Sequence, residues 1–331
     1  MTAATREAVR TAPAAVPAPR AAHLHSRRRR ERASTIVRFV VALIVCVVMA
    51  FPFYWMLVVA LSPGDELFTN VFRLWPSTLT LANFGDLFGE VDVVTWFGNS
   101  VVITAFVTVL GVLVNLLAGY AFAKLRFLGK NALFFAALAT LVLPVQVTMV
   151  AQFRLVSDLG IYGTYWAVIL PSAATATGVF LARQFILGIP DELLEAAKLD
   201  GAGSLRIFRS VVLPLCRPLV AVLVVLIAMA TWNDFAWPLI ALKQDYLYTL
   251  PIGLLFLQGQ TTPQFGRIMA LSLIAVVPMI VLFLATQRYF VQGIARSGIR
   301  GAAPVLGQAE APAVCRTCSE TSSRPSSAIT P

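Results

Sequence analysis

The chain has 331 residues, of which 58% are hydrophobic and only 13% are charged, whereas an ordinary soluble domain has about 25% charged residues. This composition excludes a soluble globular domain and, because the apolar residues fall in long runs, predicts an all-α integral membrane protein. A formal net charge of +10 could suggest nucleic acid, but the basic residues flank the apolar runs, where anionic lipid attracts them, so we expect contact with membrane lipid and none with nucleic acid.

Residues 1–33 are rich in Ala, Pro and Arg and lack an apolar stripe, so we expect a disordered cytoplasmic tail. The first apolar run, at about 39–61, follows four arginines at 27–30 and could suggest a signal peptide. This run is too long for the apolar core of a signal peptide, and the large residues at 51–55 replace the small residues that a cleavage site needs. The sequence therefore predicts an uncleaved first membrane span.

Further apolar runs continue this pattern along the chain. An α-helix needs about 20 apolar residues to cross the hydrocarbon core of a bilayer. Clean runs predict spans at about 97–123, 131–153, 159–182 and 268–287, and a run with a polar outer end predicts another at 218–242. We thus expect six transmembrane helices in one membrane domain, 34–300, followed by a second disordered tail at 301–331.

The distribution of charge orients this domain, since cytoplasmic loops of membrane proteins carry an excess of Lys and Arg. With the N-terminus inside, only four of the 26 Lys and Arg residues fall on outer segments: Arg73, Arg154, Lys243 and Arg267. The first outer loop, 62–96, carries five acids instead: Asp65, Glu66, Asp86, Glu90 and Asp92. We therefore expect a multi-pass protein of the cell membrane with both termini in the cytoplasm.

The inner segment between the fourth and fifth spans predicts two short helices. Pro190 suits a first helical position, and the acids that follow it fall in the first turn, where the helix dipole favours them. Residues 193–199 give this helix an apolar side, and Asp200-Gly201 ends it because glycine tolerates the left-handed conformation. Ser204 can cap a second helix. A cytoplasmic helix-turn-helix loop is therefore expected at 190–214.

The loop contains the pattern Glu195-Ala196-Ala197, three residues, Gly201, nine residues, Val211, one residue and Leu213-Pro214. This spacing resembles the cytoplasmic signature of the permease subunits of binding-protein-dependent ABC importers. The sequence at 191–202 is similar to that of the carbohydrate branch of this family, and it resembles the maltose-type permeases of that branch most. Other similar stretches are Asn99-Ser100, 118–127, 232–239, 248–251 and 287–293. The resemblance covers about residues 36–300, and Val211 stands where the family signature has Ile.

The resemblance implies a division of labour among several subunits. A second permease subunit, two cytoplasmic ATPase subunits and an external solute-binding protein would be the partners. The loop would dock in a groove of the ATPase and pass its movement to the spans. Its ATPase-coupling residues would be Glu195, Ala196, Ala197, Asp200, Gly201, Leu213 and Pro214.

We expect neither a catalytic residue nor a cofactor or metal in this chain. Its single Gly-Lys pair, Gly129-Lys130, is followed by Asn131 and lacks the spaced glycine of a Walker sequence, so it does not supply an ATP site. The Cys-x-x-Cys at 315–318 has no second ligand pair nearby. ATP hydrolysis is therefore expected on the partner ATPase subunits.

Three polar residues are candidates for a solute path. Asn115 shares one face of the second span with Gly111 and Gly119, which suits either close helix packing or a polar wall of the path. Asn233 and Asp234, at the outer end of the fifth span, could contact solute or stand among interfacial anchors. Both interpretations remain open for all three.

Uptake of a carbohydrate follows from the family resemblance alone. Glycerol phosphate or another polyol-like solute is the alternative within the same class, and a secondary transporter or channel is the alternative in another class. A proton-coupled transporter would carry ionisable groups deep in its spans, and the five clean spans have none. A membrane-embedded hydrolase would need a base or metal ligands at depth, but both histidines, His23 and His25, lie in the first tail.

The charge distribution makes a topology prediction. Cysteines introduced singly at Asp86 and at Ser204 should respond in opposite ways to a membrane-impermeant thiol reagent added to intact cells. We expect labelling at 86 and protection at 204, with the parent chain as the background control. The reverse pattern would exclude the six-span arrangement with inner termini.

Overall fold

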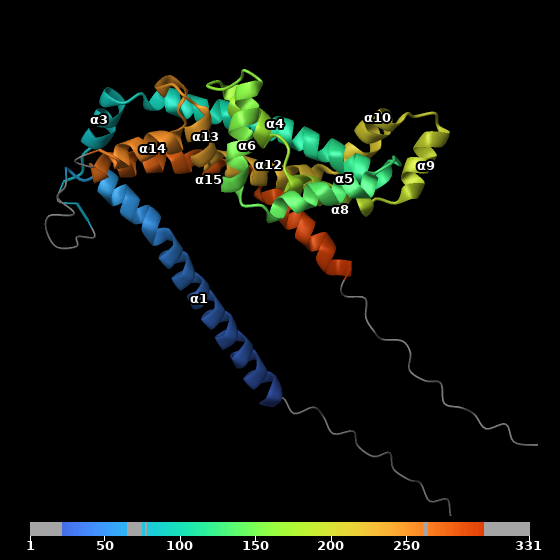
Figure 1. Cartoon of the computed structure of the whole chain (residues 1–331). Coiled ribbons are helices and arrows are strands. Elements are labelled where there is room, and N and C mark those ends of the chain that lie inside the picture. Colours follow the sequence, from blue (N-terminus) through green and yellow to red (C-terminus); the bar gives the residue numbers. More distant parts are fainter. Residues whose placement is uncertain (1–21, 65–74, 77, 261–263, 301–331) are drawn as a thin grey trace, which may run out of the picture.

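The computed structural model describes residues 22–64, 75–76, 78–260 and 264–300, and this part of the chain is built from helices without a β-strand (Figure 1). Two segments on which we expected disordered tails, 1–21 and 301–331, lie outside the described residues. Residues 22–33 were also expected in the first tail but belong to helix α1, Ala22–Ala60. Strong helix formers follow the last tail proline, Pro19, and extend the helix into the basic segment.

Four helical segments among the described residues are long and apolar enough to cross a membrane: Ser34–Ala60, Val93–Lys124, Tyr165–Leu187 and Phe265–Gln287. They lie in α1, in α4 (Val93–Lys124), in the pair α7 (Tyr165–Ser172) and α8 (Ala176–Leu187), and in α15 (Phe265–Arg300). Two bent helix pairs raise the number to six if each is one span. The predicted all-helical membrane fold is thus confirmed, with four to six candidate spans.

The segment predicted as the third span, 131–153, is bent instead of straight. Helix α5, Lys130–Ala139, and the short η1, Thr140–Val142, meet α6, Val145–Asp158, at 115°. The break falls at Pro144, which has no N–H to donate and disfavours helical geometry in the residue before it. Leu143 accordingly has extended backbone angles, φ −78° and ψ 129°.

The fourth and fifth predicted spans also differ in their limits. The fourth begins at Tyr165 rather than near 159, because Gly160 and Gly163 take φ of +70° and +76° in the preceding turns. The fifth, expected at 218–242, divides into α12, Arg217–Trp232, and α13, Ala236–Ala241. The segment Ser204–Leu215 meets α12 at 81°.

Helix α4 runs along the body from one end to the other (Figure 1). Its 32 residues extend about 48 Å at 1.5 Å per residue. It packs against α8 and α12, and the crossing with α8 is close because Gly119 meets Ala182. The face predicted from Gly111, Asn115 and Gly119 is therefore a packing surface, and all three residues are buried.

The end of the body opposite the loop at 190–214 is closed by α3, Ala82–Glu90, and by α14, Leu250–Gln258. The Asn83 amide donates to the carbonyls of Ala60 and Ser62, at 2.9 and 2.8 Å. The Arg267 guanidinium of α15 binds both carboxylate oxygens of Glu90 and lies 3.3 Å from Asp86. Helix α3 thus joins the end of α1 to the start of α15.

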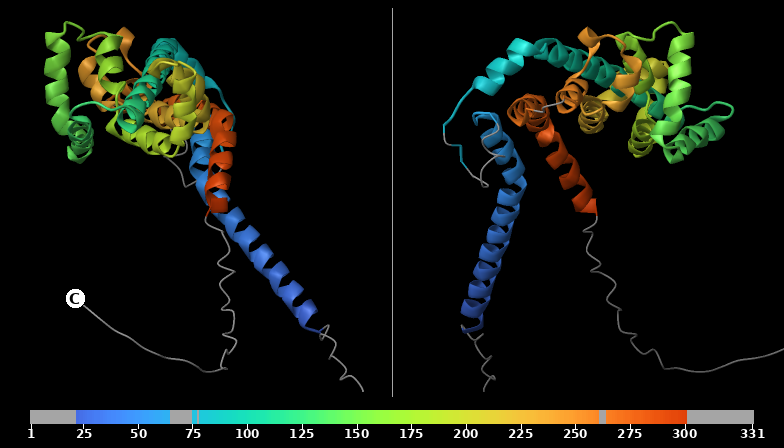
Figure 2. Two further views of the ribbon diagram at one scale, coloured as in Figure 1. Left: turned by 90° about the vertical axis from the view of Figure 1, so that its right-hand side faces the viewer. Right: turned by 60° about the vertical axis from the view of Figure 1, so that its left-hand side comes forward.

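Helix α1 stands away from the rest of the body (Figure 2). It contacts α15 near its C-terminal end, where Val58 and Val59 are buried against Met269. Along the preceding turns its large apolar side chains are exposed: Ile36, Val37, Phe39, Val40, Val41, Leu43, Ile44, Val45, Val47, Val48 and Met49. This surface must be covered by lipid or by another protein.

The α4–α8 crossing predicts a difference between two glycines of the same helix. A Cβ at Gly119 would lie 2.9 Å from backbone atoms of Ala182 and Arg183, whereas a Cβ at Gly98 would meet nothing within 4 Å. We expect Gly119→Ala to destabilise the chain by about 1–3 kcal/mol through overpacking. Gly98→Ala should keep or raise stability because alanine favours the helix. Thermal unfolding of detergent-purified chains checks this, and a Gly119→Ala midpoint at or above that of Gly98→Ala would contradict it.

Candidate functional site

The loop between α8 and α12 begins with α9, Asp191–Leu199. Pro190 precedes the helix instead of opening it, with an extended ψ of 136°. Asp191 and Glu192 occupy the first turn, where partial positive charge from the unpaired N–H groups favours carboxylates. The predicted start of the first short helix is therefore one residue early.

A glycine turn ends α9. Gly201 has φ +80°, and its N–H donates to the Lys198 carbonyl at 2.9 Å. The N–H of Ala202 donates to the Ala197 carbonyl at 3.0 Å, which completes a Schellman motif after Asp200. A Cβ at Gly201 would meet nothing within 4 Å, so backbone conformation, not space, favours glycine here.

The second arm of the loop contains α10, Ser204–Ile207, then the π-helical segment η2, Phe208–Val212, and α11, Leu213–Leu215. Ser204 was expected to cap this arm, but Gly203 holds the capping position and the Ser204 side chain makes no cap bond. The N–H of Leu213 donates to the carbonyl of Phe208, five residues earlier. Pro214, which has no N–H, follows at once.

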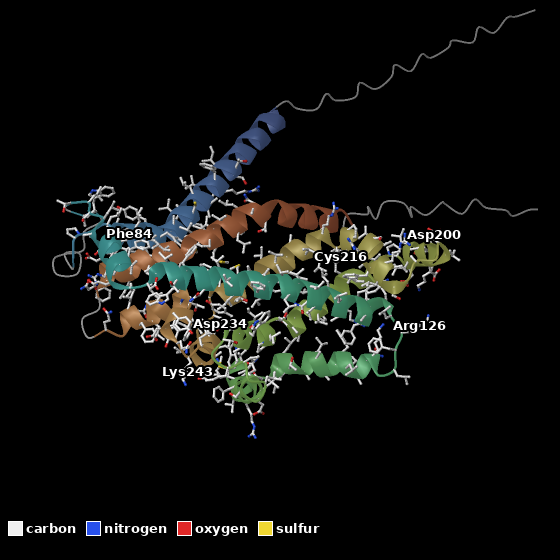
Figure 3. The ribbon with its side chains drawn as sticks, turned by 90° about the horizontal axis from the view of Figure 1, so that it is seen from above. Phe84, Arg126, Asp200, Cys216, Asp234 and Lys243 are labelled. Atoms are coloured by element: carbon white, nitrogen blue, oxygen red, sulfur yellow. The ribbon has the colours of Figure 1, made fainter. Side chains whose placement is uncertain are left out.

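The tip of the loop exposes more apolar surface than the sequence indicates. Of the apolar side expected at 193–199, Leu194 is buried, while Leu193 is 47% exposed and Leu199 is 90% exposed. Leu205 on the second arm is 73% exposed. Glu195, Ala196 and Asp200 are exposed beside them. Asp200 lies at one end of the body and Phe84 of α3 at the other (Figure 3).

Basic and aromatic side chains of α4 attach this loop to the body. Lys124 Nζ donates to the Ile189 carbonyl and to Asp191 Oδ1, both at 2.7 Å. The hydrogen bond from Lys124 holds the pKa of Asp191 below its usual value. Tyr120 Oη donates to the Ser204 carbonyl at 3.3 Å. From the sequence we assigned no role to Lys124 or Tyr120. Nothing in the residues near them indicates that they bind Ile189, Asp191 and Ser204 of the loop.

The three polar candidates for a solute path lie in different settings. Asn115 is fully buried; its Oδ1 accepts from the Thr175 N–H at 3.2 Å, in the break between α7 and α8. Asp234 Oδ1 accepts from the N–H groups of Ala236 and Trp237, at 3.1 and 3.4 Å, and so caps α13. Asn233 is exposed and borders a cavity of about 580 Å³ between α1, α12, α14 and α15.

Comparison with known proteins assigns the family. The model for "Binding-protein-dependent transport system inner membrane component" matches residues 111–296. The arabinooligosaccharides transport system permease protein AraQ of Halalkalibacterium halodurans is 38% identical over 257 residues, which cover 77% of this chain and 92% of the relative. The sn-glycerol-3-phosphate permease protein UgpE of Salmonella typhi is 33% identical, over 80% of this chain and 98% of the relative. The lactose permease protein LacG of Rhizobium radiobacter is 32% identical, over 80% and 96%.

A solved structure shares the fold. It is a bacterial ABC transporter involved in the import of the acidic polysaccharide alginate, with a TM-score of 0.70 and 23% identity, covering 79% of this chain and 98% of that one. The family match, the relatives and the apolar helices agree with the resemblance carried by the Glu195 loop. The chain therefore belongs to the inner membrane components of binding-protein-dependent transport systems and is a membrane permease subunit of an ABC importer.

Proposed function

We propose that this permease subunit takes up a carbohydrate that an external solute-binding protein delivers, with ATP hydrolysis on separate cytoplasmic subunits. The exposed tip of the α9–α10 loop carries this proposal. Apolar surface is exposed at this tip by Leu193, Leu199 and Leu205, next to the polar side chains of Glu195 and Asp200. The tip lies at one end of the helical body. An apolar patch with a polar rim is typical of a surface that binds another protein.

In this proposal the loop docks onto one of two ATPase subunits. Ala196 and Ala197 allow close approach, and Glu195 and Asp200 supply polar contacts. Gly201 holds the angle between the arms, while Leu213 and Pro214 join the second arm to α12. The loop at 190–214 thus acts as a helix-turn-helix that transmits movement, without a bond being made or broken in this chain.

We further propose a second permease subunit beside this one. The rest of the chain leaves the apolar side chains of α1 uncovered. This surface can pack against lipid and against a neighbouring transmembrane subunit. The open cavity lined by Phe53 of α1 and Met279 of α15 leaves further apolar surface uncovered. Both surfaces fit a hetero-oligomer in the cell membrane.

The topology proposed for residues 34–300 counts the bent pair α5–α6 as one span and takes α12 with α13 as another, after the loop at 190–214. Six spans then leave both termini in the cytoplasm, on the side where the Lys and Arg residues are concentrated. The α9–α10 loop faces the cytoplasm and α3 faces outward. The 115° bend at Pro144 is an interruption within a span, whereas the 81° bend lies where the cytoplasmic arm Ser204–Leu215 meets α12.

For the solute path, the geometry divides the three polar candidates. Asn115 supports helix packing, because its amide is buried and bonded to the backbone at Thr175. Asn233 borders an open cavity, and Asp234 stands beside it at the break between α12 and α13. We therefore propose Asn233 and Asp234 as the polar part of the path, with Asn115 holding the helices that surround it.

The proposed substrate class rests on the named relatives, which include permeases for arabinooligosaccharides, lactose and sn-glycerol 3-phosphate. The test is uptake by the complete complex in liposomes, with arabinotriose, lactose and sn-glycerol 3-phosphate supplied in turn. ATP-dependent uptake of a sugar would support the proposal. Uptake of glycerol phosphate alone would favour the alternative substrate, and uptake without ATP would favour a secondary transporter.

Gly201 tests the coupling role of the loop. We expect Gly201→Leu to reduce ATP-coupled uptake about 5- to 30-fold, because a leucine at φ +80° costs about 1–2 kcal/mol and shifts α9. Gly203→Leu is the matched control, since Gly203 has φ −71° and equally open surroundings. Gly201→Asn should retain most activity because asparagine tolerates the left-handed conformation. Normal coupled uptake by a membrane-inserted Gly201→Leu chain would refute the coupling role.

Asn115 tests the packing role. Asn115→Leu leaves the Thr175 N–H without its acceptor, whereas Val114→Leu on the neighbouring position changes no polar contact. Interhelical hydrogen bonds in membranes average about 0.6 kcal/mol, so the loss of assembly should be modest. We expect reduced recovery of the assembled complex with Asn115→Leu only. Equal recovery and uptake for both variants would contradict the packing role.

A further inference from the structure

The loop end of α4 holds both arms of the α9–α10 loop. Lys124 binds the first arm through the Ile189 carbonyl and Asp191, at 2.7 Å each. One helical turn earlier, Tyr120 binds the second arm through the Ser204 carbonyl at 3.3 Å. The two attachments therefore lie on either side of the Gly201 turn.

Both attachments are built into the packed body. The Lys124 side chain is only 8% exposed although its partner Asp191 is 74% exposed, so the lysine reaches outward from a buried position. Tyr120 is buried, and its ring lies against Phe208 of the second arm with centroids 5.4 Å apart. A charge-assisted hydrogen bond from a buried lysine is stronger than one between neutral groups.

Neighbouring residues hold the end of α4 itself. Lys130 Nζ donates to the carbonyls of Ala123 and Leu125, at 3.3 and 2.9 Å, and Arg183 Nε donates to the Phe122 carbonyl at 3.3 Å. The last carbonyls of a helix lack partners within the helix, so these cations occupy groups that would otherwise be free. The end of α4 is thus fixed to α5 and α8.

An open cavity separates much of the loop from α4. Its volume is about 540 Å³, and its lining includes Tyr120, Lys124, Leu194, Glu195, Lys198 and Ser204. Among the described residues, no hydrogen bond joins residues 192–203 to α4. Within the described part of the chain, the hydrogen bonds between the loop and α4 are therefore those of Lys124 and Tyr120.

The other end of α4 is held just as firmly. Asn99 Nδ2 donates to the carbonyls of Tyr246 and Tyr248, at 2.8 and 2.9 Å, and Asn99 Oδ1 accepts from Tyr165 Oη at 2.7 Å. Ser100 Oγ accepts from the N–H of Leu250 at 2.8 Å. A displacement of α4 would thus reach α7 and α14 at the far end of the body.

We propose that Lys124 and Tyr120 are positioning residues that transmit movement of the loop to α4, and through Asn99 and Ser100 to α7 and α14. This inference rests on the proposed function, because it requires an ATPase that moves the loop. It assigns the transmission to two side-chain contacts across the cavity, outside the signature residues of the loop.

The test measures solute transported per ATP hydrolysed by the complete complex in liposomes, using the member of the sugar panel that the wild-type complex transports. Lys124→Met should assemble and hydrolyse ATP, with the transport ratio lowered about tenfold or more, because both hydrogen bonds of the ammonium group, to the Ile189 carbonyl and to Asp191, are lost. Lys124→Arg should restore most of the ratio, since it keeps a cationic donor. Arg126→Met is the control, because it removes the cationic group of an exposed residue two positions after Lys124.

Tyr120→Phe removes one hydroxyl and keeps the ring against Phe208. It should lower the ratio alone, and further in combination with Lys124→Met. If Lys124→Met fails to assemble, Tyr120→Phe decides, and an unchanged ratio overturns the inference. A wild-type ratio in an assembled double variant overturns it too, while ATP-dependent uptake and its loss in Gly201→Leu would leave the proposed function intact. Wild-type uptake without ATP would instead remove the proposed function itself.

Discussion

Lipid offers no hydrogen bonds, so wherever a helix stops inside an apolar body its freed backbone groups need partners within the protein. The few polar side chains of this body meet that need. Asn115 accepts a hydrogen bond from the Thr175 N–H between α7 and α8, and Asp234 accepts hydrogen bonds from the N–H groups at the start of α13. Asn99 binds carbonyls near the start of α14. Because Asn99 and Asn115 both belong to α4, the broken segments are tied to the one long central helix.

Much of this arrangement could be predicted from residues close together in the sequence. Uncharged runs marked the apolar helices, and the Asp200-Gly201 pair marked a left-handed turn that Gly201 adopts at φ +80°. Hydropathy could not detect the bend at Pro144, because a broken helix and a straight one of the same composition average alike. The sequence also could not assign the partners of the polar residues. It shows that Asn115 is polar, which suggested a solute contact, but it does not show which backbone group the side chain binds.

The remaining features depend on contacts between distant segments. Lys124 and Asp191 are 67 positions apart, and Asn99 and Tyr246 are 147 apart. The apolar side expected at 193–199 does not form one helical face, because Leu193 and Leu199 stand about 100° and about 140° around α9 from the buried Leu194. Their exposure follows from where α9 ends up, at the edge of the body. A membrane subunit that works within an assembly leaves such surfaces uncovered when considered alone.

The π-helical turn at Phe208–Val212 has a consequence for how this family of loops can change in evolution. A π turn holds one residue more than an α-helical turn over the same length. Deleting that residue would convert the turn into ordinary α-helix while the residues on either side keep their directions, because the π turn already absorbs the extra residue. A deletion from a regular α-helix would instead rotate the preceding part by about 100°. The second arm can therefore lose one residue between Gly203 and Pro214 without turning the first arm away from its place.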